Sequence, residues 1–260
     1  RRAVAYKAYY ENMPLRPEMV PLGPNARLYK RMAFGSLVNF HLLDDRQFRS
    51  PQACPRPGRG GANVVDPATC AELADPGRSM LGAAQERWLE AGLKGSRAQW
   101  NVLAQQTTMA QLDQQAGPGR AAWTDGWDGY PAARGRLIDA LGDPAVANPV
   151  VIGGDVHMAF VNDLRRDFDQ PATPVVASEF VGTSISSQAR SQASVERLLP
   201  DNPHIRFAEA RYRGYTRVEV TPAHMSVELR GLDSAARRDS ACSTRAKFVV
   251  EDGRPGAHKA

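Results

Sequence analysis

Long apolar runs and low-complexity segments are missing from this sequence. The longest apolar stretches, at 149–152 and 174–177, have the length of short strands, whereas a helix needs about 20 apolar residues to cross a bilayer. We therefore expect no membrane span in these residues. With 260 residues, of which 42% are hydrophobic and 23% charged, the chain has the composition of a folded protein and is too long for a peptide ligand.

Two common catalytic motifs are also absent. There is no Gly-x-Ser-x-Gly elbow and no Walker loop, which disfavours a serine hydrolase and a nucleotide-driven enzyme. Charge of one sign is not in large excess, because 33 Lys and Arg face 28 Asp and Glu and give a net charge of +5. This excess favours anions such as phosphates only weakly. It is too small to indicate a specific nucleic-acid partner.

Cysteine is scarce, with three residues in the chain. Cys54 and Cys70 flank a segment rich in Gly, Pro and Asn that has no helical or strand periodicity, which predicts a loop closed by a disulfide. A bridge that closes about 15 residues contributes roughly 3 kcal/mol in the chain-entropy model. Such bridges persist in oxidising compartments, so we expect a secreted or periplasmic protein. The alternative is two reduced cysteines in a loop, and Cys242 is unpaired in either case.

Hydrophobic periodicity predicts an α/β domain with a mixed sheet and a strand-rich tail. No internal repeat and no domain boundary are evident. Helices are expected over 6–13, 81–89, 131–141 and 188–199, and strands at 32–34, 37–43, 100–104, 150–152, 174–181, 205–208, 215–220, 225–229 and 247–250.

Polar residues follow two of the expected buried strands, where open α/β sheets place their reactive groups. After the strand at 150–152, two glycines precede Asp155 and His157. If this turn stays extended, both side chains point the same way and could bind one or two cations, such as iron, zinc, manganese or a mixed site with calcium. After the strand at 100–104, Gln105 and Gln106 offer amide oxygens. In both places the alternative is an ordinary solvated loop.

Several sequence blocks occur in the order seen in one enzyme family. They are AYYENMPLR at 8–16, FGSLVNFHLLDDRQFR at 34–49, GAAQERWLEAGLKGSRAQWNVLAQQ at 82–106, WDGYPAARGRLIDAL at 127–141, VVIGGDVHMAFVNDL at 150–164 and EFVGTSISS at 179–187. Together they resemble the alkaline phosphatase D (PhoD-like) group of calcineurin-type metallophosphoesterases. The resemblance implies the C-terminal half of a metallophosphatase-type sandwich, with mixed β-sheets flanked by helices.

The resemblance also implies roles for individual residues. Asp155 and His157 stand where the superfamily has its last Gly-His-x-His motif, so we expect both to be metal ligands and catalytic residues. Gln105 replaces a ligand histidine and is expected to face the site and contact substrate. Trp127 and Tyr130 either wall the cleft over the leaving group or simply pack a loop.

Other residues near these motifs have a structural alternative. Asp44 is expected to anchor a turn near Arg46. Arg16 and Arg46 either clamp a phosphate oxygen or form ion pairs. Glu179, Thr183 and Ser184 either support the ligands or cap a helix. The three histidines His41, His204 and His224 are expected to be structural.

The family's other metal ligands lie in an N-terminal half that precedes the AYYE block, and none of those motifs occurs here. We therefore expect residues 1–260 to be the C-terminal portion of such a domain, with an N-terminal fragment of the same precursor as partner. The expected function is metal-dependent hydrolysis of phosphate monoesters or diesters, with iron and calcium as cofactors. The alternative is a catalytically inactive fragment with a structural or binding role.

Overall fold

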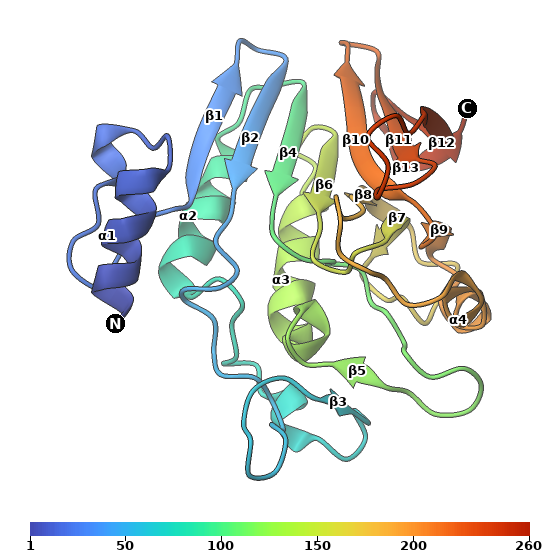
Figure 1. The fold of residues 1–260 in the computed structure, drawn as a ribbon. Coiled ribbons are helices and arrows are strands. Elements are labelled where there is room, and N and C mark those ends of the chain that lie inside the picture. The colour runs from blue at the N-terminus through green and yellow to red at the C-terminus, as the bar shows by residue number, and fades with distance from the viewer.

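A seven-stranded mixed sheet forms the centre of the molecule (Figure 1). The structure is a computed structural model that describes all 260 residues. The strand order of the sheet is β1-β2-β4-β6-β8-β7-β9. The strands are β1 (Lys30–Phe34), β2 (Val38–Leu42), β4 (Trp100–Ala104), β6 (Pro149–Gly153), β7 (Ala159–Arg165), β8 (Val175–Val181) and β9 (Ile205–Glu209). Because β2, β4, β6 and β8 are parallel neighbours, their carboxyl ends meet at one edge of the sheet.

A second sheet of four antiparallel strands packs on one face of the first (Figure 1). Its strands are β10 (Arg213–Val220), β11 (His224–Leu232), β12 (Cys242–Glu251) and β13 (Arg254–Lys259). The residues of β11 alternate between buried and partly exposed, as expected when one face of a strand is covered. Trp100, Val150 and Phe180 meet Val227 and Phe248 between the two sheets.

Helices cover the other face of the central sheet (Figure 1). The longer ones are α2 (Ala83–Lys94) and α3 (Pro131–Leu141), and their apolar residues Leu89 and Ile138 pack with Leu103 and Val151 of the sheet. Consequently β4 is buried on both faces, which explains why four of its five residues are apolar, with Asn101 as the exception.

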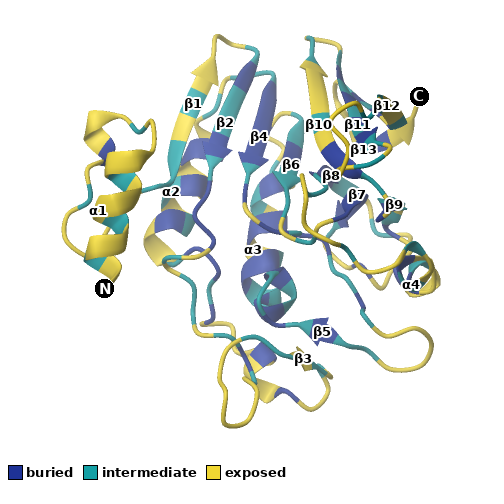
Figure 2. Ribbon diagram, viewed as in Figure 1, coloured by how far each residue is buried: buried dark blue, intermediate teal, exposed yellow.

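Helix α1 (Arg2–Asn12) and several short elements complete the fold. No helix has the length and apolarity that a bilayer crossing requires. Helix α1 lies at the edge beyond β1 and has no buried residue (Figures 1 and 2). The remaining elements are α4 (Gln192–Glu196), β3 (Val64–Val65), β5 (Ala122–Trp123) and 3-10 turns at Pro17–Met19, Ala71–Ala74, Trp127–Gly129 and Leu199–Asp201.

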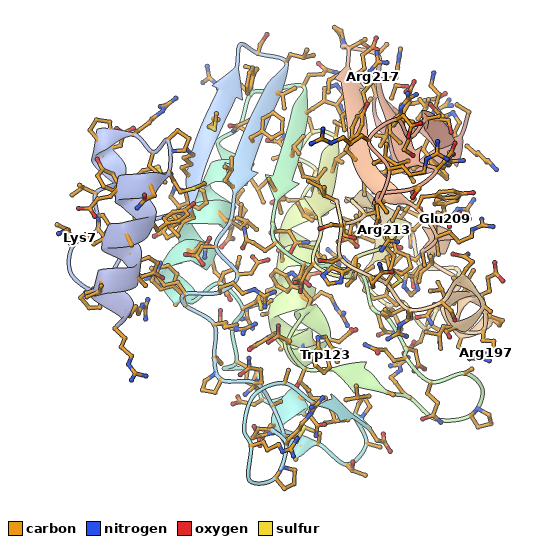
Figure 3. All side chains as sticks on the ribbon, in the orientation of Figure 1. Lys7, Trp123, Arg197, Glu209, Arg213 and Arg217 are labelled. Atoms are coloured by element: carbon orange, nitrogen blue, oxygen red, sulfur yellow. A yellow bond between two sulfur atoms is a disulfide. The ribbon has the colours of Figure 1, made fainter.

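Exposed cations occur on widely separated parts of the chain. Figure 3 labels Lys7 on α1, Arg197 after α4 and Arg217 on β10, and these three cations are exposed on separate elements.

Most expected elements are present, and the α/β class is confirmed. Four strands that periodicity does not indicate are added: the two-residue strands β3 and β5, and the longer β7 and β13. Strand β7 buries Asn162 and Asp163 as well as its apolar residues, so it shows no alternation. The helix expected over 188–199 is reduced to α4 and a 3-10 turn, because Ser191 caps α4 and Pro200 follows shortly after its end.

Cys54 and Cys70 are joined in a disulfide, as expected, and Cys242 is free. The closed loop carries β3, which pairs with β5 through Val64 and Trp123. The disulfide therefore closes the loop at 54–70, and the pairing of β3 with β5 holds this loop against the chain just before residues 124–130.

Replacing both Cys54 and Cys70 by Ser should lower the free energy of unfolding by about 3 kcal/mol, because the unfolded chain regains the freedom of the loop. Urea unfolding of the oxidised protein measures this change. Cys242→Ser, which breaks no bridge, is the matched control. Equal unfolding midpoints for the double variant and this control would contradict the prediction.

Candidate active site

Three loops meet at the carboxyl edge of the parallel strands, following β2, β4 and β6. Two reciprocal hydrogen bonds join the first two loops, since the Asp45 amide donates to Gln106 Oε1 at 2.7 Å and the Gln106 amide donates to Asp45 Oδ2 at 3.0 Å. The third loop packs closely on the second, because a Cβ on Gly153 would collide with the carbonyl oxygen of Thr107. Glycine is therefore required where β6 ends.

Asp155 and His157 both adopt left-handed backbone conformations, with φ of 73° and 60°. Few residues other than Gly occupy this region, and those that do are often found at functional sites. The turn is thus not extended, and the argument that an extended turn aligns the two side chains does not hold here. Their expected role as ligands rests instead on the environment of each side chain.

Each of the two side chains has one defined partner. Asp155 Oδ2 accepts a hydrogen bond from Arg46 Nη2 at 2.9 Å, and the Asp155 side chain is 44% exposed. His157 Nδ1 lies 3.0 Å from the carbonyl oxygen of Gln188. A carbonyl only accepts, so Nδ1 must donate, which leaves Nε2 as the lone-pair nitrogen of the neutral ring. Histidine ligands of metals are commonly oriented by such a bond.

The donor set fits only part of a cation site. No group of three or more His, Cys, Asp or Glu side chains gathers anywhere in this chain in a way that could hold a metal ion. Asp155 and His157 provide one carboxylate and one imidazole, fewer than the four to eight ligands that protein-bound cations usually take. The structure therefore gathers no complete set of His, Cys, Asp or Glu ligands around these two residues.

Arg46 links this turn to Asp125, a residue that the sequence motifs do not single out. Arg46 Nη1 donates to Asp125 Oδ2 at 2.7 Å, while Arg49 and Gln52 hold Asp125 Oδ1 at 3.0 and 2.8 Å. Burial alone would raise the pKa of Asp125, but the hydrogen bond from Gln52 and the two arginines outweigh it and lower the pKa. Asp125 is therefore a firmly held anion beside the turn.

The three residues expected to contact substrate lie in the interior. Trp127 and Tyr130 are 1% and 0% exposed, so they pack the loop, which is the alternative to a cleft wall. The Trp127 indole donates to Gln105 Oε1 at 3.1 Å, and the Tyr130 hydroxyl donates to the Ser50 carbonyl at 2.6 Å. Gln105 Nε2 donates to the Thr107 carbonyl, so its amide is occupied at both ends.

Glu179 supports a neighbouring loop and caps no helix. Its carboxylate accepts the backbone amides of Met109 and Ala110 at 2.6 and 2.9 Å and the Asn162 side chain at 2.8 Å. Burial raises the pKa of Glu179, and these hydrogen bonds act in the opposite direction. The site therefore rests on a buried polar framework.

Thr183 and Ser184 bind backbone carbonyls. The Thr183 hydroxyl donates to the carbonyls of Tyr212 at 2.9 Å and His157 at 3.3 Å, so it contacts the backbone of one expected ligand. The Ser184 hydroxyl donates to the Ser187 carbonyl at 2.6 Å. Neither side chain caps a helix.

The remaining residues have structural roles. Asp44 Oδ1 accepts the amides of Arg46 and Gln47 at 3.1 and 2.9 Å, which makes the expected turn. Arg16 forms an exposed pair with Glu18 at 3.8 Å. The three histidines lie away from the turn. His41 is buried beside Trp88 without a hydrogen-bond partner, His204 binds the Gln111 carbonyl, and His224 contacts Thr221.

Asp45 should make the stability of this edge depend on pH. Burial raises the pKa of Asp45 to about 6. A raised folded-state pKa means that the unfolded chain ionises first, so Asp45 destabilises the fold progressively from about pH 4 to pH 6. The measured quantity is the difference between the free energies of unfolding of the wild type and of Asp45→Asn. This difference should fall by up to about 3 kcal/mol between pH 4 and pH 7, because only the wild type carries the buried carboxyl group. Urea unfolding at both pH values measures it, and a pH-independent difference would contradict the prediction.

Comparison with known proteins agrees with this architecture. The family model described as "PhoD-like phosphatase" matches residues 1–229. Alkaline phosphatase D of Bacillus subtilis (strain 168) is 39% identical over 262 residues, covering 100% of this chain and 43% of that protein. A solved structure described as "Structure of PhoD" is 38% identical with a TM-score of 0.89, covering 100% of this chain and 48% of that one. The chain thus spans less than half the length of these relatives, and it belongs to the PhoD-like phosphatase family.

Proposed function

We propose that this chain forms one side of a metal-dependent active site that hydrolyses phosphate esters, as an alkaline phosphatase or phosphodiesterase. The observation that carries the proposal is the turn after β6. In this turn Asp155 and His157 adopt left-handed backbone conformations, and the Gln188 carbonyl orients the His157 ring. This orientation leaves Nε2 available as a ligand atom. The chain that carries this turn belongs to a phosphatase family.

In the proposed site Asp155 contributes a carboxylate oxygen and His157 contributes Nε2. Iron and calcium are the proposed cations. When bound, such cations would polarise the phosphoryl oxygens and lower the pKa of a coordinated water. The chain's own contribution is positional. The Thr183 hydroxyl contacts the His157 carbonyl at 3.3 Å, and Gly153 allows β6 to approach the loop after β4.

The other ligands are proposed to come from an N-terminal segment of the same precursor. Two observations support this partner: the chain covers 43% of alkaline phosphatase D, and apolar side chains lie exposed around α1 and β1. Val4, Leu22 and Phe34 are 71, 79 and 58% exposed. We further propose that the protein is exported, because the Cys54–Cys70 disulfide is stable in an oxidising compartment.

One specific observation favours the alternative of a catalytically inactive piece. The Asp155 carboxylate is bound to Arg46 and no third acidic, histidine or cysteine side chain joins it in a metal-holding group. In that case the chain would retain neither iron nor calcium, even together with its N-terminal segment. Elemental analysis of the purified complete protein separates the two functions.

Asp155→Ala and His157→Ala should each lower the hydrolysis of p-nitrophenyl phosphate by the complete protein about 100-fold or more. Loss of an outer-shell partner alone costs a metal site 10- to 100-fold, and loss of a direct ligand should cost at least as much. Bound metal should fall in parallel, while the far-UV circular dichroism spectrum of the folded protein stays unchanged.

Matched controls are Asp239→Asn, in an exposed loop where it pairs only with Arg237, and His258→Ala on β13. Both should retain wild-type turnover. Full turnover in either the Asp155 or the His157 variant would refute the assignment.

A further inference from the structure

We propose that Arg46 binds the phosphoryl group of the substrate and that Asp125 positions its guanidinium. This inference rests on the proposed phosphoesterase function, because it assigns a substrate contact within that same site. It follows from the way in which Arg46 is held and from the donors that it leaves open.

The backbone of Arg46 is locked at the carboxyl edge of the sheet. Asp44 accepts its amide at 3.1 Å, and the preceding residue, Asp45, exchanges two hydrogen bonds with Gln106. The side chain therefore starts from a fixed point beside the loops that follow β4 and β6.

The Arg46 side chain is also held in place. The residue that holds it, Asp125, is fixed by contacts outside the turn of Asp155 and His157. Asp125 Oδ2 binds Nη1 at 2.7 Å, while Arg49 and Gln52 hold the other oxygen of Asp125. Arg49 Nη1 also donates to the Asp125 carbonyl at 2.9 Å. Asp125 thus stays in place whether or not Arg46 has an additional partner.

The other end of the guanidinium points to the turn, where it binds an anionic oxygen. Nη2 binds Asp155 Oδ2 at 2.9 Å, so an anionic oxygen already occupies the position that a phosphate oxygen would take. A guanidinium has five N–H donors in a fork that matches phosphate. These two carboxylates take one bond each, and the side chain remains 36% exposed.

The guanidinium of an arginine is always charged in proteins, so Arg46 presents a permanent positive charge to this position.

Neither Arg49, three residues further along the same loop, nor Arg16 has this combination. Arg49 is only 17% exposed and directs both Nη atoms to Asp125. Arg16 is 66% exposed, and its pair with Glu18 is also exposed and 3.8 Å long, so nothing orients it toward the turn. Of the three, only Arg46 is both rigidly held and open on the side of Asp155.

The test measures phosphate binding and turnover separately, in the complete protein with its metals. Arg46→Gln should raise the KM for p-nitrophenyl phosphate and the inhibition constant of inorganic phosphate by the same factor, about 10- to 100-fold. Metal content should not change. Arg46→Lys keeps the charge but loses the fork, so its phosphate affinity should be intermediate. Asp125→Asn should shift both constants in the same direction by a smaller factor.

Arg237→Gln is the matched control, because it removes an arginine that pairs with Asp239 in an exposed loop. Calorimetric titration with inorganic phosphate measures phosphate affinity without turnover. The phosphoesterase function and the phosphate-binding role of Arg46 are therefore tested independently. A wild-type protein that binds metal but hydrolyses no ester rejects the proposed function. If Arg46→Gln binds phosphate with wild-type affinity, the proposed role of Arg46 is overturned. If the Gln variant does not fold, wild-type phosphate affinity in Arg46→Lys overturns it instead.

Discussion

The burial of the parallel strands on both faces is the constraint on which the rest of this structure depends. Helices α2 and α3 cover one face and β10 to β13 cover the other, so the central strands have no free surface except at their ends. Polar groups that follow β2, β4 and β6 must therefore collect at one edge, where loops leave the sheet. The candidate ligands, the arginine and its acidic partner all lie on these loops or on the segment held against them.

This edge is fixed by polar interactions that are themselves buried. Glu179, on β8, accepts two amides of the loop after β4, and Gln105 binds within the same loop. A buried carboxylate without partners would destabilise the fold by several kcal/mol, but here each oxygen of Glu179 is bonded. The framework thus stiffens the loop that Gly153 contacts, which places Asp155 on a rigid base.

Periodicity predicted the elements that have one apolar face, such as the helix at 131–141 and the strands β10 to β12 of the tail. It missed β13, and it missed β7, whose Asn162 lies in the core. The family, the α/β class and the disulfide were also predictable, because motif order and cysteine context are local signals. The direction of side chains was not. Trp127 in a glycine-flanked loop could equally line a cleft or pack beneath it, and only the tertiary structure places its indole on Gln105. Arg46 and Asp125 lie 79 positions apart, and no local pattern indicates such a pair.

The pair of Arg46 and Asp155 bears on how a complete site would assemble. Both side chains are more than one-third exposed, and ion pairs of that kind contribute about 0–1 kcal/mol. A cation that gains several ligands at once can exceed this by a wide margin, so the arginine would be no barrier to the proposed metal binding. Its pairing instead keeps the carboxylate oriented and its charge compensated when no cation is bound. The same guanidinium, still anchored by Asp125, then faces whichever anion enters the site.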